Sequence, residues 1–314
     1  MKAALSGFWR QAMEPRLPAD VEPAWFQSVD EAAEAMKGAR VAQLDLLCDQ
    51  DDFIRVLDNS DEIEWVACCF AGVDRFPLEY MAKRGIKFTN GVGLNAVPVA
   101  EWAVMGCYTI AKGFADIVRM HDRKNWSMTP YGTVQVSQSN VLVIGYGHIG
   151  KEIARQLRGI GADVTVVRSK ADPANGVLGP DDWRARLNEF DFVILAAPGT
   201  PETHHMIGAD ELKAMKGSAG LINIARGALI DQAALKEAME NGEIAGALLD
   251  PAEPEPLPAG DPLWDAKNTL VTAHLSGRSQ TIMPRGVTDL FLDNLERLKS
   301  GEELINLVDT RRGY

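Results

Sequence analysis

The sequence predicts an α/β protein with two domains, each built around a parallel β-sheet. Two series of short apolar segments alternate with helical segments, which is the pattern of sheets covered by helices. A glycine-rich turn at 145–150 joins an apolar strand to an amphipathic helix in the second series. The chain has 314 residues, of which 46% are hydrophobic, so it is long and apolar enough for two cores.

The first series precedes residue 97 and predicts an open parallel sheet. Helices are expected at 28–40 and 77–85, because Gly38 and Gly85 stand where a helix ends. The acidic run at 49–52 is interpreted as a solvated loop or as the surface of a helix start. Short apolar strands are expected at residues 2–7, 41–47, 64–74 and 86–91.

A single long helix is expected at 97–120. It is apolar on nearly every side, whereas a surface helix shows one apolar stripe, so it must bury more than one face. Two interpretations stay open: a central core helix, or a helix between domains or between subunits. A polar stretch rich in serine and glutamine follows at 129–140.

The second series predicts another parallel sheet with helices between its strands. A proline-rich stretch at 250–262 is expected to be a rigid loop, and an amphipathic helix is expected at 281–301. The expected strand segments cover residues 141–144, 162–167, 190–199, 220–227, 244–250 and 269–277.

The glycine-rich turn, "VLVIGYGHIG", predicts a dinucleotide site. Gly145 permits a tight turn, Gly147 lets the backbone approach a pyrophosphate, and Gly150 lets helix and strand pack closely. The helix that follows adds amide donors and a partial positive charge, and His148 and Ile149 lie in the same turn beside the pyrophosphate. The alternative is an ordinary strand–turn–helix that binds nothing.

The strand after this helix predicts which cofactor binds. NAD-binding sites of this type place an acid at the carboxyl end of the strand, where it binds the ribose hydroxyls. Here Asp163 precedes the strand, and Arg168, Ser169 and Lys170 follow it. Two cations and a hydroxyl favour a 2′-phosphate, so NADP(H) is expected in preference to NAD(H). The alternative is a pair of surface cations at a strand end.

Charge and cysteine content limit the partners and the compartment. A net charge of −12 without a local basic stripe argues against binding to nucleic acid or to an anionic membrane. No apolar run reaches the ~18 residues of a membrane span. The four cysteines include no C-x-x-C pair, and the opening "MKAALSGFWRQ" has no signal-like apolar stretch. Reduced thiols and a cytoplasmic location are therefore expected.

Four polar residues near strand ends predict the chemistry, because open α/β sheets bind ligands at the carboxyl ends of their strands. Arg226, Asp250 and His274 end apolar strands, and Glu255 lies in the stiff loop after Asp250. An arginine binds the carboxylate of a 2-keto acid, a protonated histidine gives a proton as hydride arrives, and a nearby carboxylate keeps that histidine charged. The alternative is a set of loop salt bridges. No metal site is expected.

These motifs together resemble the D-isomer-specific 2-hydroxyacid dehydrogenases. The resemblance runs from about "CCFAGVD" to "HLSG", and its specific matches are "GYGHIG", "PGTPETHHMIG", "LINIARGALID", "LLDPAEPEPLP" and "TAHLSG". It implies two Rossmann-like domains with parallel sheets and an active site in the cleft between them. Residues 98–276 are then the NAD(P)-binding domain, and residues 1–97 with 277–314 are the substrate-binding (catalytic) domain.

The resemblance also implies a role for each of the four strand-end residues. Arg226, Glu255 and His274 match the family's catalytic arginine, glutamate and histidine. Of these, Arg226 and His274 also contact the substrate. Asp250 matches the aspartate on the nicotinamide side of the cofactor.

Further contacts follow from the same resemblance. A substrate loop that offers backbone amides to the carboxylate falls on Ala71, Gly72 and Val73, and Asn95 lies near that site. The remaining implied cofactor contacts are Pro198, Thr203, Ile224, Ala225 and Gly277.

The chain departs from the family at positions that shape the pocket. Pro251 and Ala252 stand where the family usually has valine and phenylalanine, and Ala273 stands where it usually has proline before the histidine. These departures leave the chemistry intact and bear on the choice of substrate.

The cationic segment at 168–170 resembles the NADPH-preferring glyoxylate/hydroxypyruvate reductases of the family. The expected reaction is therefore the NADPH-dependent reduction of a small 2-keto acid to the D-2-hydroxy acid. The family resemblance also implies a homodimer joined through the cofactor domain. Two alternatives stay open. One is a non-catalytic NAD(P)-sensing scaffold of the corepressor kind, and the other is an oxidising dehydrogenase that acts on formate or phosphite.

Overall fold

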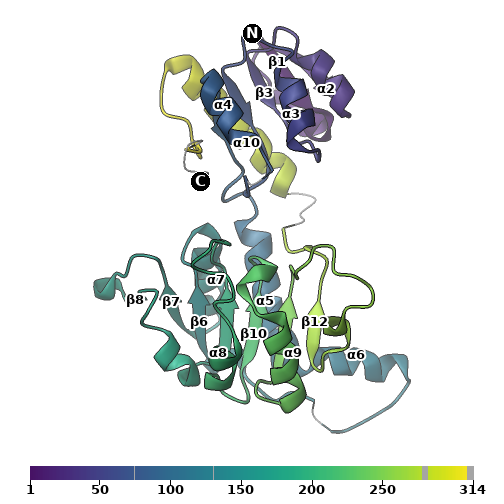
Figure 1. The fold of residues 1–314 in the computed structure, drawn as a ribbon, viewed down its shortest axis with the longest axis vertical. Coiled ribbons are helices and arrows are strands. Elements are labelled where there is room, and N and C mark those ends of the chain that lie inside the picture. Colours follow the sequence, from purple (N-terminus) through teal and green to yellow (C-terminus); the bar gives the residue numbers. More distant parts are fainter. Residues whose placement is uncertain (74, 130, 278–281, 310–314) are drawn as a thin grey trace. The chain divides into compact units, whose positions relative to one another are not determined.

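The computed structural model describes residues 1–73, 75–129, 131–277 and 282–309. The chain divides into two compact units, Met1–Asn95 with Ser279–Tyr314 and Ala96–Arg278. In Figure 1 the purple N-terminal strands and the yellow helix α10 (Ile282–Ser300) belong to the first unit, and the teal and green elements belong to the second. The first unit is therefore built from both ends of the chain.

The first unit contains a five-stranded sheet in the order β2-β1-β3-β4-β5, with parallel pairing throughout. Its strands are β1 (Lys2–Ser6), β2 (Glu22–Phe26), β3 (Val41–Gln43), β4 (Trp65–Ala67) and β5 (Lys87–Thr89). Its helices besides α10 are α1 (Arg10–Met13), α2 (Val29–Met36), α3 (Gln50–Leu57) and α4 (Leu78–Arg84). Each face of the sheet packs against an apolar cluster, with Ala4 on one face and Leu5 on the other.

Helix α3 decides between the two interpretations of the acidic run at 49–52. The carboxylate of Asp49 accepts a hydrogen bond from the Asp52 amide at 2.9 Å, so the run is a capped first helical turn. The amphipathic helix expected at 281–301 is α10, which packs Phe291 against the ring of Trp65. Thr281, the first residue of that expected range, lies outside the described residues.

The second unit contains a seven-stranded sheet in the order β12-β11-β10-β9-β6-β7-β8, again with parallel pairing. The predicted α/β class with two parallel sheets is confirmed. The strands are β6 (Asn140–Ile144), β7 (Asp163–Val167), β8 (Val177–Leu178), β9 (Phe192–Leu195), β10 (Gly220–Asn223), β11 (Gly246–Leu249) and β12 (Thr269–Val271). The helices are α5 (Ala96–Lys112), α6 (Phe114–Asp122), α7 (His148–Gly159), α8 (Ala209–Ala214) and α9 (Gln232–Asn241).

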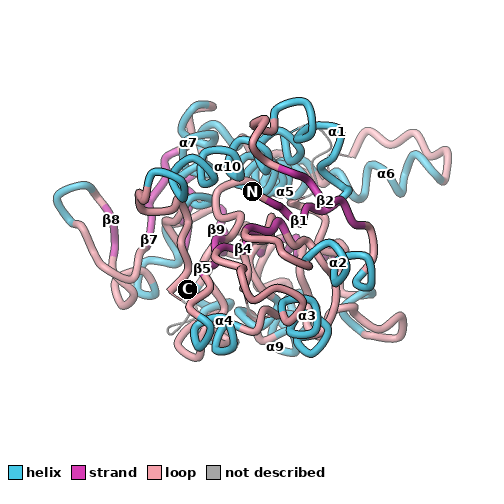
Figure 2. The backbone as a smooth tube through the Cα atoms, turned by 90° about the horizontal axis from the view of Figure 1, so that it is seen from above, coloured by secondary structure: helices cyan, strands magenta, loops and turns pink. Residues whose placement is uncertain are grey.

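The single helix expected at 97–120 is wrong, because the chain breaks it into α5 and α6 at Gly113. Gly113 adopts a φ of +59°, and a Cβ atom there would lie 2.6 Å from Cβ of Tyr131. This close approach and the left-handed backbone require glycine. Helix α5 packs on the sheet as a core helix, while α6 buries none of its residues. Figure 2 shows α6 and the loop after it projecting from the rest of this unit.

Strand β6 marks the point where the strand order of this sheet reverses. Its neighbour on one side is β7, and its neighbour on the other side is β9. Parallel sheets of this type bind ligands outside the carboxyl ends of the strands at such a reversal. The turn that leaves β6 at this edge is the glycine-rich turn.

Candidate active site

The glycines of the turn after β6 meet different surroundings. A Cβ atom on Gly145, whose φ is +106°, would lie 2.4 Å from the carbonyl carbon of Ala196, and one on Gly150 would lie 1.8 Å from the oxygen of Gly145. These two glycines are required by the fold itself. A Cβ atom on Gly147 would have no neighbour within 4 Å. The protein leaves this space open, as the close approach of a pyrophosphate requires.

Helix α7 begins at this open position. His148 is its first residue and is exposed, and Ile149 is half-buried. Within the described part of the chain, no side chain caps the helix. Its free amide donors and the positive end of its dipole therefore face the space beside Gly147, which fits the phosphates of a dinucleotide.

The carboxyl end of β7 carries the predicted selectivity segment. Arg168, Ser169 and Lys170 are all exposed, and the Arg168 amide donates to the Leu178 carbonyl at 3.0 Å, which fixes where the segment begins. Neither cation forms an ion pair with a described residue. Asp163, expected to precede the strand, is its first residue, so its carboxylate lies at the opposite edge of the sheet.

The turn after β10 presents Arg226. The side chain of Asn223, which is fully buried, donates to the Arg226 carbonyl at 2.8 Å and accepts from the Ala225 amide at 3.0 Å. Ile224 and Ala225 are buried, and Arg226 is exposed. The side-chain amide of Asn223 thus fixes the backbone on both sides of Arg226, while the guanidinium group of Arg226 remains at the surface.

Two glycines allow neighbouring loops to pack closely against the turn that carries Arg226. A Cβ atom on Gly227 would lie 2.4 Å from the carbonyl carbon of Ala252, so the arginine turn contacts the loop that carries Glu255. A Cβ atom on Gly199 would lie 3.2 Å from Cγ of Arg226. These close approaches gather the turns after β9, β10 and β11 at one edge of the sheet.

The turn after β9 holds its own shape. The hydroxyl of Thr203 donates to the Pro198 carbonyl at 2.7 Å and accepts from the Thr200 amide at 2.8 Å. The two predicted cofactor-contacting residues of this turn, Pro198 and Thr203, are therefore bonded to each other.

Asp250 follows β11 and organises the turn after β12. It is completely buried, and its Oδ1 accepts from the Thr272 hydroxyl at 2.7 Å and from the Leu275 amide at 2.8 Å. Its Oδ2 accepts from the Ser276 amide at 3.0 Å, and its backbone carbonyl accepts from the His274 amide at 2.9 Å. Gly277, a predicted cofactor contact, follows this turn. The carboxylate thus fixes the backbone on both sides of the histidine.

His274 and Glu255 meet at the surface of the same edge. Nδ1 of His274 lies 2.8 Å from Oε1 of Glu255, and their side chains are 42% and 53% exposed. Because an ionised carboxylate only accepts, Nδ1 carries a proton in this contact and Nε2 is left to face a ligand. His274 has a φ of +51°, which is a strained region for a non-glycine residue, and the Asp250 hydrogen bonds hold it there.

Asp250 also supports a prediction about stability. Asp250→Ala leaves buried donors of the 272–276 turn without acceptors, so we expect the free energy of unfolding to fall by about 3–5 kcal/mol. Urea denaturation measures this. Asp231→Ala removes only the cap of α9 and should cost about 1 kcal/mol. Equal losses for the two variants would contradict the organising role of Asp250.

The predicted substrate loop lies in the first unit, after β4. Ala71 is exposed, Gly72 is half-buried and Val73 is buried. The side chain of Asn90 donates to the Ala71 carbonyl at 2.9 Å. Asn95 is the last residue of the first segment of this unit, and its Oδ1 is buried without a partner among the described residues.

Sequence reasoning missed the residues that hold the functional ones in place. Asn223 and Asn90 are buried polar side chains that bond to backbone rather than to ligand. A polar residue at the end of an apolar strand, as in "GLIN" and "KFTN", is the signal that marks them. This signal does not reveal which backbone groups the side chain contacts, because those groups reach the side chain only when the turn is folded.

Residues 104–276 match the family model described as "D-isomer specific 2-hydroxyacid dehydrogenase, NAD binding domain". A glyoxylate reductase from Korarchaeum cryptofilum is 31% identical over 275 residues, which is 85% of this chain and 82% of the relative.

Solved structures give the same picture. A D-isomer specific 2-hydroxyacid dehydrogenase from Lactobacillus delbrueckii ssp. bulgaricus, in its NAD-complexed form, is similar with a TM-score of 0.84 at 25% identity, covering 98% of this chain and 100% of its own. An NADPH-dependent glyoxylate/hydroxypyruvate reductase from Sinorhizobium meliloti, in complex with citrate, has a TM-score of 0.80 at 25% identity, with 98% of each chain covered.

Proposed function

We propose that this chain, which belongs to the D-isomer specific 2-hydroxyacid dehydrogenase family, reduces a small 2-keto acid to the D-2-hydroxy acid with NADPH. The chain is an oxidoreductase of that family with a nicotinamide-dinucleotide-binding domain. One observation carries the finer proposal. The His274–Glu255 pair, 2.8 Å apart, lies at the same carboxyl edge of one parallel sheet as the glycine-rich turn and the free cations after β7.

Each functional residue at this edge of the sheet has its own role in the proposed reaction. A bound nicotinamide cofactor supplies the hydride that adds to C2 of the keto acid. Arg226 binds the substrate carboxylate and polarises the keto oxygen through its guanidinium. His274 gives the Nε2 proton to that oxygen as the hydride arrives, which completes the hydroxyl group. Glu255 keeps the ring oriented through Nδ1 and stabilises the positive charge that the ring carries before transfer.

The proposed substrate class rests on the names of similar proteins and on the predicted substrate loop of the first unit. The relative from Korarchaeum cryptofilum is named a glyoxylate reductase, and the structure from Sinorhizobium meliloti is named a glyoxylate/hydroxypyruvate reductase. We assign further contacts to the substrate carboxylate, in addition to that of Arg226, to the backbone amides at 71–73, with Asn95 near them. On this assignment the unit Met1–Asn95 with Ser279–Tyr314 is the substrate-binding domain and the unit Ala96–Arg278 is the cofactor domain, each boundary two residues from the one expected from the sequence.

The choice of NADPH rests on the end of β7. The free cations Arg168 and Lys170, with the hydroxyl of Ser169, supply the charge and donors that a 2′-phosphate needs. The acid that would bind the ribose hydroxyls of NADH is absent from this end, since Asp163 lies at the start of the strand.

A panel of keto acids tests the proposal. Glyoxylate, hydroxypyruvate, pyruvate and phenylpyruvate are each offered with NADPH or NADH, and the loss of reduced cofactor is followed by absorbance. We expect turnover of glyoxylate or hydroxypyruvate with NADPH. A protein that consumes neither cofactor with any of the acids would contradict the proposed reaction.

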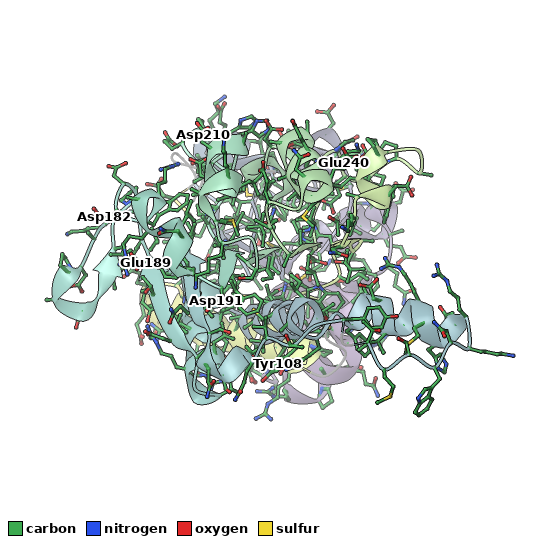
Figure 3. The ribbon with its side chains drawn as sticks, turned by 90° about the horizontal axis from the view of Figure 1, so that it is seen from below. Tyr108, Asp182, Glu189, Asp191, Asp210 and Glu240 are labelled. Atoms are coloured by element: carbon green, nitrogen blue, oxygen red, sulfur yellow. The ribbon has the colours of Figure 1, made fainter. Side chains whose placement is uncertain are left out.

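A homodimer formed through α5, α6 and the loop after α6 accounts for an exposed apolar surface. Trp126 is 91% exposed and Met128 is 86% exposed. Tyr108 on α5, labelled in Figure 3, is also exposed. Apolar side chains gathered in this way mark interaction surfaces. The remaining large apolar side chains exposed on this part of the unit are Val97, Met105, Phe114, Val118 and Tyr131.

The dimer proposal makes a prediction. The double variant Trp126→Ser, Met128→Ser should raise the dimer dissociation constant by about tenfold or more, since buried aromatic anchors dominate interfaces. Light scattering after size exclusion, over a dilution series, measures this. Ile160→Ser, at the end of α7, is the matched control and should change nothing. A parent that is monomeric at every concentration would contradict the dimer.

The acidic surface of the second unit bears on the possible partners of the protein. Figure 3 labels the acidic residues Asp182, Glu189, Asp191, Asp210 and Glu240 on the second unit. Together with the net charge of −12, they support a protein without a nucleic-acid partner. None of the helices in the described ranges is long and apolar enough to cross a membrane. All four cysteines are free, which supports the cytoplasmic location.

A further inference from the structure

Asp45 is a buried carboxylate that the proposed chemistry does not use. It lies two residues after β3 in the first unit and is 6% exposed. Its Oδ1 accepts from the Cys69 amide at 2.6 Å, and the side-chain amide of Gln43 donates to both of its oxygens. The indole N–H of Trp9 donates to its Oδ2. Burial raises the pKa of this carboxyl group, because the charged form loses its water.

The donors to Asp45 come from the ends of adjacent strands. Trp9 lies in the short helical turn after β1, Gln43 ends β3, and Cys69 lies two residues after β4. These strands are neighbours in the sheet order β1-β3-β4. The carboxylate therefore joins the segments that leave the carboxyl edge of the sheet. Within the described residues no cation pairs with it, so it is not held by a salt bridge.

The segment that Asp45 holds leads directly into the predicted substrate loop. The Cys69 amide is bonded to Asp45, the Phe70 carbonyl accepts from the Gly91 amide at 2.8 Å, and the Ala71 carbonyl accepts from Asn90 at 2.9 Å. None of the amides of Ala71, Gly72 and Val73 donates to a described residue. The backbone before these amides is thus fixed at successive residues, while the amides themselves stay available.

The second unit uses the same device. Asp250 follows β11 and accepts from the amides of Leu275 and Ser276, beyond the neighbouring strand β12, which fixes His274. Asp45 follows β3 and accepts from the amide of Cys69, beyond the neighbouring strand β4. In both units a buried aspartate after one strand holds the functional turn that leaves the next strand.

We propose that Asp45 is a positioning residue that holds the backbone amides at 71–73 in place to bind the carboxylate of the 2-keto acid. This inference rests on the proposed function. The carboxylate of the substrate is bound in the ground state and in the transition state alike, so misplaced amides weaken both equally. Such a loss raises KM and leaves kcat unchanged.

The test uses Asp45→Asn, which keeps the size of the side chain. It replaces one accepting oxygen by an NH₂ group, which then faces N–H groups that donate to Asp45 in the parent. For the best keto acid of the panel, we expect KM to rise about tenfold, with kcat and the KM for NADPH within about twofold of the parent. The inhibition constant of oxamate, a non-reducible analogue that carries the same carboxylate, should rise with KM. Trp9→Phe removes one donor and keeps an aromatic ring, so a smaller rise of about threefold is expected.

The control is Ser60→Ala. Ser60 is a buried residue of the same unit whose hydroxyl donates to the Ala39 carbonyl at 2.7 Å, away from the loop. Its KM, kcat and oxamate constant should equal those of the parent. A KM for Asp45→Asn within about twofold of the parent, or an equal rise in Ser60→Ala, overturns the inference.

Hydrogen exchange separates this inference from the proposed function. In Asp45→Asn, the Cys69 amide, which donates to Asp45 in the parent, should exchange faster than in the parent and in Ser60→Ala. If the parent reduces no keto acid, the proposed function fails, and the exchange rates alone decide whether Asp45 holds the loop. Unchanged exchange in Asp45→Asn and in Trp9→Phe overturns the positioning role whatever the activity.

Discussion

His274→Ala is expected to lower kcat for keto-acid reduction by about 10²–10⁴-fold, the range of general acid catalysis. The alanine leaves no group near the keto oxygen that gives a proton as hydride arrives. The KM for NADPH should change little, because the glycine-rich turn and the cations after β7 lie outside the His274–Glu255 contact. Stopped-flow measurement of a single hydride transfer isolates this step from product release.

His205→Ala is the matched control for that experiment. His205 is an exposed histidine with a φ of +49°, close to the +51° of His274, and it stacks on His204. Both substitutions therefore remove an exposed imidazole from a left-handed position. Transfer in His274→Ala within tenfold of the parent, or an equal loss in His205→Ala, would remove His274 from the role of acid.

Arg168→Asp is expected to invert the cofactor preference. Contacts between charged groups contribute about 1.5–3 kcal/mol each, and exposure at the rim brings them to the low end, so two cations give NADPH a preference of about 10²-fold. The aspartate repels the 2′-phosphate and offers acceptors to the ribose hydroxyls of NADH. The ratio of kcat/KM for the two cofactors measures the change, and the parent ratio should shrink as salt rises.

Arg186→Asp makes the same change of charge elsewhere in the second unit. Arg186 pairs with Glu189 in the segment between β8 and β9, away from the end of β7. Its cofactor ratio should equal that of the parent. If the parent uses NADH as well as NADPH, Arg168 and Lys170 are surface cations without a role in selectivity.

The sequence was sufficient to predict the fold class because the strands are short, apolar and bounded by glycine, and such patterns are local. It also placed polar residues at strand ends, and parallel pairing then brings those ends to one edge of a sheet. The structure shows Glu255 and His274 in contact there. Their catalytic roles, like those of the other site residues, remain predictions.

What the sequence did not predict depends on contacts between distant segments. At the break, Tyr131 packs closely against Gly113, and the helical periodicity of the sequence does not predict this contact. Asp45 and Asn223 are isolated in the sequence from the groups that they contact, because their partners, the Cys69 amide and the Arg226 turn, are set by strand order and turn geometry. Such positioning residues need the fold before they are recognised.

The fate of the transferred hydride tests the central claim most directly. NADPH carrying deuterium at C4 of the nicotinamide ring, on the face that the enzyme uses, is incubated with the protein and hydroxypyruvate, and the product is analysed by mass spectrometry and chiral chromatography. The account predicts D-glycerate with deuterium at C2. Unlabelled hydroxypyruvate recovered together with intact NADPH would contradict it and would indicate a protein that binds the cofactor without turning it over.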